Sequence, residues 1–395
     1  MASYNLNDIL GGPNLTGLVN EAASGLTDWL GPEWRPTNPS SKVLGDTGEY
    51  TITVGQRGVA TLGAYGAASK SAQMIVIGKR QVKLIHTVEN ITLPVLVYQN
   101  LLQYNELKFQ EMGKQEVTRQ VTEFKKRFSN LRIAAPIQAL FSGMVNFDGN
   151  GNLLAAGASV PTNGTSVSMM VPNGTTAVPS LPGTTFNGTN IGTAIDVLAS
   201  GTATMGRDTG GAGAGTWANP STNIPQQIKN TIIAVERLCG MKIEMALYGS
   251  NINTYAAYNT ALNSFLVRNS GANDQFVRLN EVPSPFLGVT WKDMSMAYFQ
   301  DQNGVSQPLV GANQVVLCPK PSAEWLGWLE GSYMIPKDVG TLWDPNNPNA
   351  QFDTVYGMFA YGQNQSDPVT AKIVAGDTFL PVFTNPYPLV IATVA

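Results

Sequence analysis

The stretch from Val95 to Leu131 reads VLVYQNLLQYNELKFQEMGKQEVTRQVTEFKKRFSNL and carries the strongest secondary-structure signal of the sequence. It contains no proline, and Pro94 directly before it suits the first turn of a helix. Apolar residues recur at alternating steps of four and three positions, which places them on one side of a helix. They are Val117, Val121, Phe124, Phe128 and Leu131. Glu123 and Arg127 can pair on the polar side. We predict one long helix that is closed by Pro136, with the apolar stripe packed on a sheet.

The length of this helix is informative in itself. At about 1.5 Å per residue it would span about 50 Å, which is long for one globular domain. This favours a spine on which other elements are arranged. A coiled coil is the alternative interpretation, but the regular stripe covers only about two heptads, and a coiled coil needs three or four.

The segments before the helix predict two arms. Residues 1–45 have little strand pattern, and their one short amphipathic candidate has few apolar partners nearby, so we expect an N-terminal arm that lies elsewhere on an assembly or on a neighbouring subunit. Residues 46–93 contain β-type runs separated by Gly, such as EYTITVGQ and SAQMIVIGKRQVKLIHTV, which predict a projecting two-stranded arm. Its basic residues are candidates for contact with an adjacent subunit: Arg57, Lys70, Lys79, Arg80 and Lys83.

The segments after the helix predict two further regions. Residues 94–151 join the helix to a hairpin, FSGMVNFDGNGNLLAAG, whose turn is Asp148–Gly151; a calcium loop is the alternative, but the spacing and the closing Glu of such a loop are missing. Residues 152–221 are nearly free of charge and predict a loop- and strand-rich insertion. Residues 222–345 predict an α/β domain in which Gly240 ends one helix and NINTYAAYNTALNSFLVRN forms a second. Residues 346–395 predict strands that return to the domain of the long helix.

The composition excludes several classes of function. Charged residues make up 13% of the 395 residues, about half of the usual share. A charge-poor surface suits burial against partner subunits, and an ordinary loop-rich composition is the alternative interpretation. The formal net charge of -3 gives no overall attraction to phosphate, which disfavours a sequence-reading DNA-binding module. Cys239 and Cys318 lie far apart and read as buried apolar residues. The sequence has no apolar stretch long enough for a membrane span, and its N-terminus lacks a signal-peptide pattern.

The sequence also offers little for catalysis. His86 is the only histidine and lies in an alternating, strand-like stretch, so a histidine-based triad would lack a second base. Carboxylates are scattered singly, which is typical of solvated surfaces, although a carboxylate pair brought together by folding remains an open alternative. Phosphate-binding, dinucleotide-binding and zinc-protease motifs are absent from the sequence. We therefore expect no catalytic residues, no metal site and no cofactor.

The order of these predicted elements resembles that of the coat proteins of tailed bacteriophages, in particular the lambda-type head-protein family. Three segments carry the resemblance in their sequence pattern. They are FSGMVNFDGNGNLL after the long helix, GTWANPSTNIPQQIKNTIIAVERLCGMKIEMALYGSNINTYAAYNTAL, and WKDMSMAYFQDQNG followed by QVVLCPKPSAEWLGWLEGSYMIP. The likeness covers most of residues 45–395 as a similarity of order and pattern, without a diagnostic short motif. Residues 152–220 depart from the short version of the family.

The resemblance implies an α+β fold, with an N-terminal arm, an extended β-hairpin arm, a spine helix, a peripheral β-sheet domain and an axial α/β domain. It implies a major capsid protein that self-assembles into pentamers and hexamers of an icosahedral head around double-stranded DNA, and no enzymatic activity. The implied partners are copies of itself, scaffold, portal and decoration proteins, and weakly held DNA, with assembly in the bacterial host cytoplasm and residence in the virion. Another β-rich virion protein, such as a tail, fibre or decoration protein, is the alternative.

Overall fold

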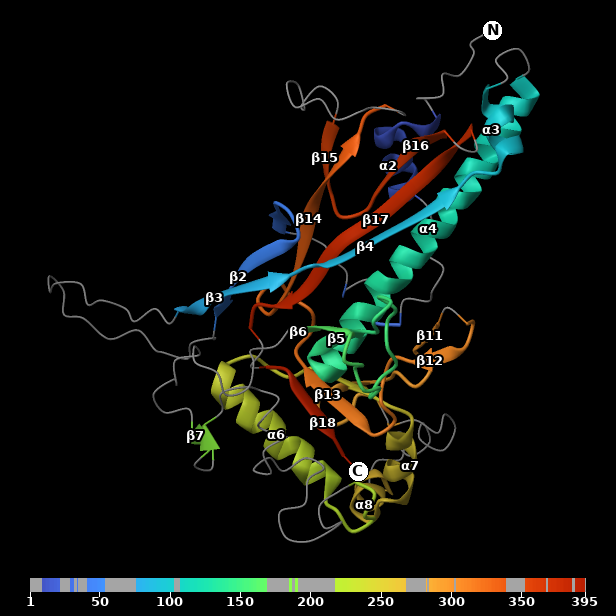
Figure 1. Ribbon diagram of the computed structural model, residues 1–395. Helices are drawn as coiled ribbons and strands as arrows, with labels where there is room; N and C mark the ends of the chain where they lie inside the picture. The colour runs from blue at the N-terminus through green and yellow to red at the C-terminus, as the bar shows by residue number, and fades with distance from the viewer. Residues whose placement is uncertain are drawn as a thin grey trace, which may run out of the picture. The chain divides into compact units, whose positions relative to one another are not determined.

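The structure is a computed structural model of the whole chain, and its described residues fall into several ranges. They are 9–21, 29–31, 34, 41–53, 76–102, 107–168, 185–186, 189–190, 217–267, 282, 284–301, 303–338, 352–366, 369–385 and 388–394. The chain divides into two compact units (Figure 1). Unit 1 comprises Met1–Glu49, Gln81–Ala134 and Trp328–Pro381, and unit 2 comprises Tyr50–Arg80, Ala135–Gly327 and Val382–Ala395. The described residues form both helices and sheets, so the α+β class is confirmed.

Unit 1 is built on a mixed, six-stranded sheet. Its main path runs β1-β14-β17-β16, while β15 pairs with β14 and β4 pairs with β17. The strands are β1 (Ser41–Val43), β4 (Ile85–Thr92), β14 (Leu326–Pro336), β15 (Phe352–Tyr356), β16 (Phe359–Ser366) and β17 (Val369–Phe383). The fifteen-residue β17 holds the sheet together because it pairs in antiparallel fashion with β16 through residues 369–376 and with β4 through residues 372–379.

The predicted spine is divided into two helices. Helix α3 spans Val95–Leu102 and α4 spans Leu107–Ser142. Helix α4 continues through Pro136, where we predicted its end. A proline inside a helix costs about 3 kcal/mol, but the flanking residues Ala135, Ile137 and Phe141 are buried, and this burial offsets the lost hydrogen bond.

The apolar stripe of α4 lies in the core of unit 1, together with residues of the sheet. Val117, Val121, Phe124 and Phe128 are buried there, and the two phenylalanine rings stack with their centroids 6.2 Å apart. Leu131 is half-buried and lies outside this core cluster, so its place in the predicted stripe was wrong.

The N-terminal segment packs on the sheet of its own subunit. Helix α2 (Gly12–Glu21) lies against β16 (Figure 1), and Leu15 and Val19 are fully buried in the same core as Phe124. The hydroxyl of Thr16 donates to the carbonyl oxygen of Ala360 and accepts from its amide, at 3.0 Å each. The expectation that this arm would lie elsewhere on the assembly or on a neighbouring subunit is therefore wrong for α2, because the sheet of the same subunit offers its apolar face the partners that the first 45 residues lack.

The predicted β arm is shorter than its sequence pattern suggested. Strands β2 (Thr47–Thr53) and β3 (Val76–Lys83) form a separate two-stranded sheet. Residues 85–92, which we included in the arm, form β4 and pair with Phe379 to Lys372 of β17. Alternating buried and exposed residues fit either a free ribbon or a sheet strand, so the pattern alone could not place this boundary.

Unit 2 contains a four-stranded sheet of order β10-β9-β13-β18. The strands are β9 (Met245–Tyr248), β10 (Thr290–Asp293), β13 (Gln314–Cys318) and β18 (Val390–Thr393). Strand β18 pairs with β13, whereas we expected all of residues 346–395 to return to the domain of the long helix. Conversely, most of β14 belongs to unit 1, although we assigned it to the second domain. The sequences of both strands suit either sheet, so only long-range pairing decides which sheet each of them joins.

The remaining elements of unit 2 are short. Strands β5 (Met144–Phe147) and β6 (Thr165–Ser168) pair with each other, as do β11 (Tyr298–Gln300) with β12 (Ser306–Pro308), and β7 (Thr185–Phe186) with β8 (Thr189–Asn190). The predicted turn at Asp148 is present: its carboxylate accepts from the amides of Asn150 and Asn152 at 2.8 Å. We expected β5 to pair with the residues directly after the turn, but it pairs with β6. The residues after the turn contribute one isolated bridge, between Phe147 and Leu153.

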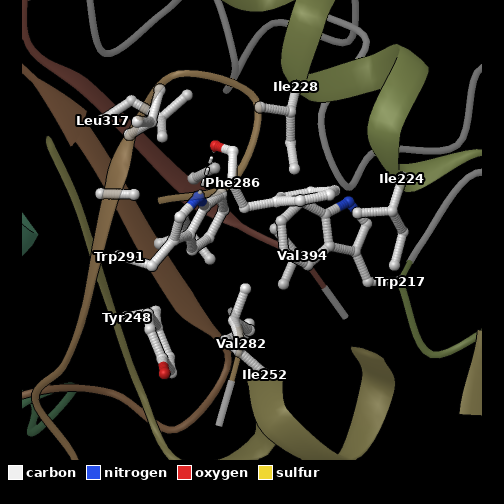
Figure 2. Packing of buried hydrophobic residues seen from close by; sticks show 14 of the residues in the cluster. Trp217, Ile224, Ile228, Tyr248, Ile252, Val282, Phe286, Trp291, Leu317 and Val394 are labelled. Carbon is white, nitrogen blue, oxygen red and sulfur yellow. Dashed lines mark hydrogen bonds between the residues drawn. The ribbon is translucent and has the colours of Figure 1, made fainter. Parts of the chain in front are cut away.

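The helices of unit 2 pack around an aromatic core. They are α6 (Ile224–Cys239), α7 (Asn251–Tyr258) and α8 (Thr260–Val267). Figure 2 shows Trp217, Phe286 and Trp291 among aliphatic side chains, with the Trp291 indole donating to the carbonyl oxygen of Phe286 at 3.2 Å. The single helix that we predicted for NINTYAAYNTALNSFLVRN is divided into α7 and α8 at Asn259. The side-chain amide of the buried Asn259 donates to the carbonyl oxygen of Thr222 at 2.7 Å.

The C-terminal cap of α6 supports a first prediction. Gly240 has φ +77°, and its amide donates to the carbonyl oxygen of Glu236 at 3.0 Å. We expect Gly240→Ala to lower the free energy of unfolding by about 1 kcal/mol, because a Cβ strains this left-handed conformation. Gly17→Ala, within α2 and with open space around its Cβ, should instead raise it by about 0.5 to 1 kcal/mol. Thermal melts that shifted in the same direction for both variants would contradict the assigned cap.

Candidate functional site

The predicted contact residues gather on the two-stranded arm as far as the structure describes them. Lys83 ends β3 and is exposed, between the buried side chains of Val82 and Leu84. Lys79 and Arg80 belong to the same strand, but their side chains lie outside the described set. Arg57 and Lys70 lie outside the described residues. The backbone therefore brings Lys79, Arg80 and Lys83 onto one strand of the arm.

A second site, which the sequence pattern did not single out, surrounds Arg132 of α4. Its Nε donates to Oδ2 of Asp377 at 2.6 Å and its Nη2 donates to Oδ1 at 2.7 Å. Its Nη1 donates to Oε1 of Glu330 at 3.1 Å. The Asp377 side chain is 0% exposed, and those of Arg132 and Glu330 are 22% and 19% exposed. We call these three residues the Arg132 cluster.

The surroundings of the guanidinium leave it little freedom. The guanidinium carbon lies 5.2 Å from the ring centroid of Phe379, which is a favourable cation–π arrangement. Gly357 lies beside it with φ +74°, and a Cβ at that position would come within 2.8 Å of Nη2 and 3.1 Å of the Glu330 carboxyl carbon. The close approach of this backbone is thus possible only with glycine.

The charged groups of the cluster shift one another's pKa values. Burial by itself would lower the pKa of Arg132, but the charges of Asp377 and Glu330 and their hydrogen bonds outweigh it, so the pKa is raised. Burial raises the pKa of the Asp377 carboxyl, and Arg132 opposes that shift. The buried carboxylate therefore relies on Arg132 for its charge compensation.

The sequence contains a signal for this cluster. Each member is an isolated charge within an apolar run: NLRIAAPIQAL around Arg132, WLGWLEGSYMI around Glu330 and IVAGDTFLPVF around Asp377. A charged residue is seldom buried unless it is paired with an opposite charge. Three isolated charges in apolar runs therefore indicate that these residues pair with one another. Their pairing, however, joins positions 198 and 245 residues apart, which no local pattern encodes.

The described candidates for chemistry, His86 and Cys318, have structural surroundings. The His86 ring shares a 2.7 Å hydrogen bond with the Thr378 hydroxyl and stacks on Tyr333. Cys318 is buried in β13, and burial raises the pKa of its thiol well above the ordinary range, which disfavours a reactive thiolate. The Cys239 side chain lies outside the described set. In the described ranges, no group of three or more metal-ligating side chains occurs, and no helix has the length and apolar character of a membrane span.

Comparisons with known proteins found similarity among solved structures alone. A protein described as a capsid protein of a prophage of E. coli CFT073 is 12% identical, with 80% of this chain and 79% of that chain covered and a TM-score of 0.40. A phage-related protein of Bordetella bronchiseptica RB50 is 10% identical, with coverages of 99% and 98% and a TM-score of 0.42. The mature capsid of bacteriophage PhiM1 is 11% identical, with 94% of this chain and 89% of that chain covered and a TM-score of 0.38. No protein-family model and no curated protein matches the chain.

Proposed function

We propose that this chain is the major capsid protein of a tailed phage and assembles into the pentamers and hexamers of an icosahedral head. One observation carries the proposal, namely the order in which the chain builds its two units. A two-stranded ribbon, a 36-residue helix, a hairpin and an α/β unit follow each other, and strands β15, β16 and β17 then complete the sheet of unit 1. This is the order on which the resemblance to the lambda-type head proteins rests.

The distribution of charge supports an assembling role. Charged residues make up only 13% of the chain, and extended apolar cores in both units account for its folding. A charge-poor surface suits repeated contact between subunits. The net charge of -3 suits a shell that holds packaged double-stranded DNA weakly, since tight binding to phosphate needs many basic contacts. We propose no enzymatic activity, because His86 and Cys318 are engaged in structural contacts.

The partners follow from this role. The principal partner is a second copy of the chain, contacted by the β2–β3 arm through residues such as Lys79, Arg80 and Lys83. Scaffold, portal and decoration proteins and the packaged DNA are further proposed partners. The protein would assemble in the host cytoplasm and reside in the virion.

The arm provides the test of this function. Deleting Thr61–Ser71, which lie in the connection between β2 and β3, should leave a soluble, folded subunit that no longer forms stable shells. Sedimentation velocity would show the loss of the fast-sedimenting species, while circular dichroism would give the same melting temperature as the unaltered chain. Lys126→Gln, on the exposed side of α4, serves as a folded control that should retain assembly. Normal yields of shells from the deletion variant would contradict a contact role for the arm.

A further inference from the structure

The Arg132 cluster lies within unit 1, and each of its members is close in sequence to a point where the chain crosses from one unit to the other. Helix α4 leaves unit 1 after Ala134, two residues beyond Arg132. Strand β14 enters unit 1 at Trp328, two residues before Glu330. Strand β17 leaves unit 1 after Pro381, four residues beyond Asp377. Three elements that connect the units thus each contribute one member of a single buried network.

The geometry of the network favours positioning over stabilisation. Buried ion pairs add little net stability, because the loss of hydration offsets their attraction, and apolar residues of similar volume can often replace them. The two-pronged contact of a guanidinium with a carboxylate is strongly directional, however. With Asp377 gripped at 2.6 and 2.7 Å and Phe379 and Gly357 enclosing the guanidinium, the cluster defines one position of α4 relative to β14 and β17.

The other charges of α4 hold the helix less firmly. Arg127 also joins α4 to the sheet, with its Nη1 2.9 Å from Oε2 of Glu89 in β4, but its side chain is 60% exposed and that of Glu89 is 31% exposed. Arg119 pairs with Glu116, and Lys126 pairs with Glu123, both within the same helix turn and with exposed cations. Such pairs stabilise a helix weakly and tie it to nothing else. Of the ion pairs between described residues, that of Arg132 with Asp377 includes a fully buried carboxylate and joins the helix to the centre of the sheet.

We propose that Arg132, Glu330 and Asp377 are positioning residues that fix α4 against β14 and β17 within unit 1, and thereby set a single size of the assembled shell. The inference rests on the proposed function. A closed shell repeats the same subunit geometry many times, so a small angular uncertainty in each subunit changes the number of copies that close it. A device that selects one geometry is therefore worth more to assembly than to folding.

An apolar replacement of the cluster separates the two roles. The variant Arg132→Met/Glu330→Met/Asp377→Leu should fold with a thermal midpoint close to that of the unaltered chain. Its shells, measured by negative-stain microscopy, should have several diameters where the unaltered chain gives one. Hydrogen exchange of the unassembled subunit should accelerate at least about tenfold at the amides of residues 128–134 and 377–381. The control Glu116→Gln/Arg119→Met removes an exposed pair from the same helix and should change neither measurement.

The outcomes are distinguishable. A single unaltered diameter together with unaltered exchange in the triple variant would overturn the proposal, because the cluster would then be replaceable packing. If the triple variant fails to fold, Glu330→Gln, which keeps the Arg132–Asp377 pair, decides in its place: faster exchange and broader diameters support positioning, and unaltered values overturn it. If the unaltered chain forms no shells, the proposed function fails, and the exchange rates alone decide whether the cluster positions the three segments.

Discussion

Replacing Phe124 by Ala is expected to lower the free energy of unfolding by about 3 to 5 kcal/mol, because it removes a buried ring and leaves a cavity. Phe124 is 5% exposed, stacks on Phe128 and lies in the core that α2, α4 and the sheet of unit 1 share. A loss of this size is a large part of the total stability of a typical domain, so the variant should be largely unfolded before it can assemble. Denaturant titration followed by circular dichroism measures the effect.

The matched control is Lys126→Gln, two residues away on the exposed side of the helix. Its partner is Glu123 in the same helix, with both side chains largely in solvent, so the change in free energy of unfolding should stay within about 0.5 kcal/mol. Lys125 is a less suitable control, because its ammonium approaches the sulfur of Met358 at 3.6 Å. A harmless Phe124→Ala and a severe Lys126→Gln would show that the faces of α4 are assigned the wrong way round.

Replacing Arg132 alone by Met should be as damaging as the loss of Phe124. The single variant leaves the carboxylate of Asp377 buried without its cation, and breaking a buried pair in this way costs about 3 to 5 kcal/mol. The contrast with the triple variant is diagnostic, since that variant removes the carboxylates as well. Denaturant titrations of the single variant, the triple variant and the unaltered chain measure this difference. Equal stability of the single variant and the unaltered chain would contradict the described pairing.

The long helix and its core face could be predicted because they follow from local periodicity. Val117, Val121, Phe124 and Phe128 recur at helical spacing, and the helix buries all four. The cap at Gly240 and the turn at Asp148 are equally local, since each follows from the conformations that one or two residues permit. For such features the sequence contains the whole physical cause.

Features that depend on distant partners could not be predicted in the same way. Helix α4 continues through Pro136 because apolar residues on both sides of the proline are buried in a core. Helix α2 packs on its own subunit because β16 provides an apolar surface for it. Strand β18 pairs with β13 across a long stretch of chain, and even the pair nearest in sequence, Leu317 and Val390, is 73 positions apart. The Arg132 cluster is the extreme case, since its three charges come from three elements and each looks isolated in its own segment.

Negative-stain electron microscopy of the purified, unaltered chain tests the central claim most directly. A shell-forming subunit should give closed particles of one diameter, or ring-shaped pentamers and hexamers where closure is incomplete. The particles should dissociate or fail to form in the Thr61–Ser71 deletion variant under the same buffer conditions. A field of small, discrete particles with the size of single subunits at every protein concentration, or of long rods, would contradict the account.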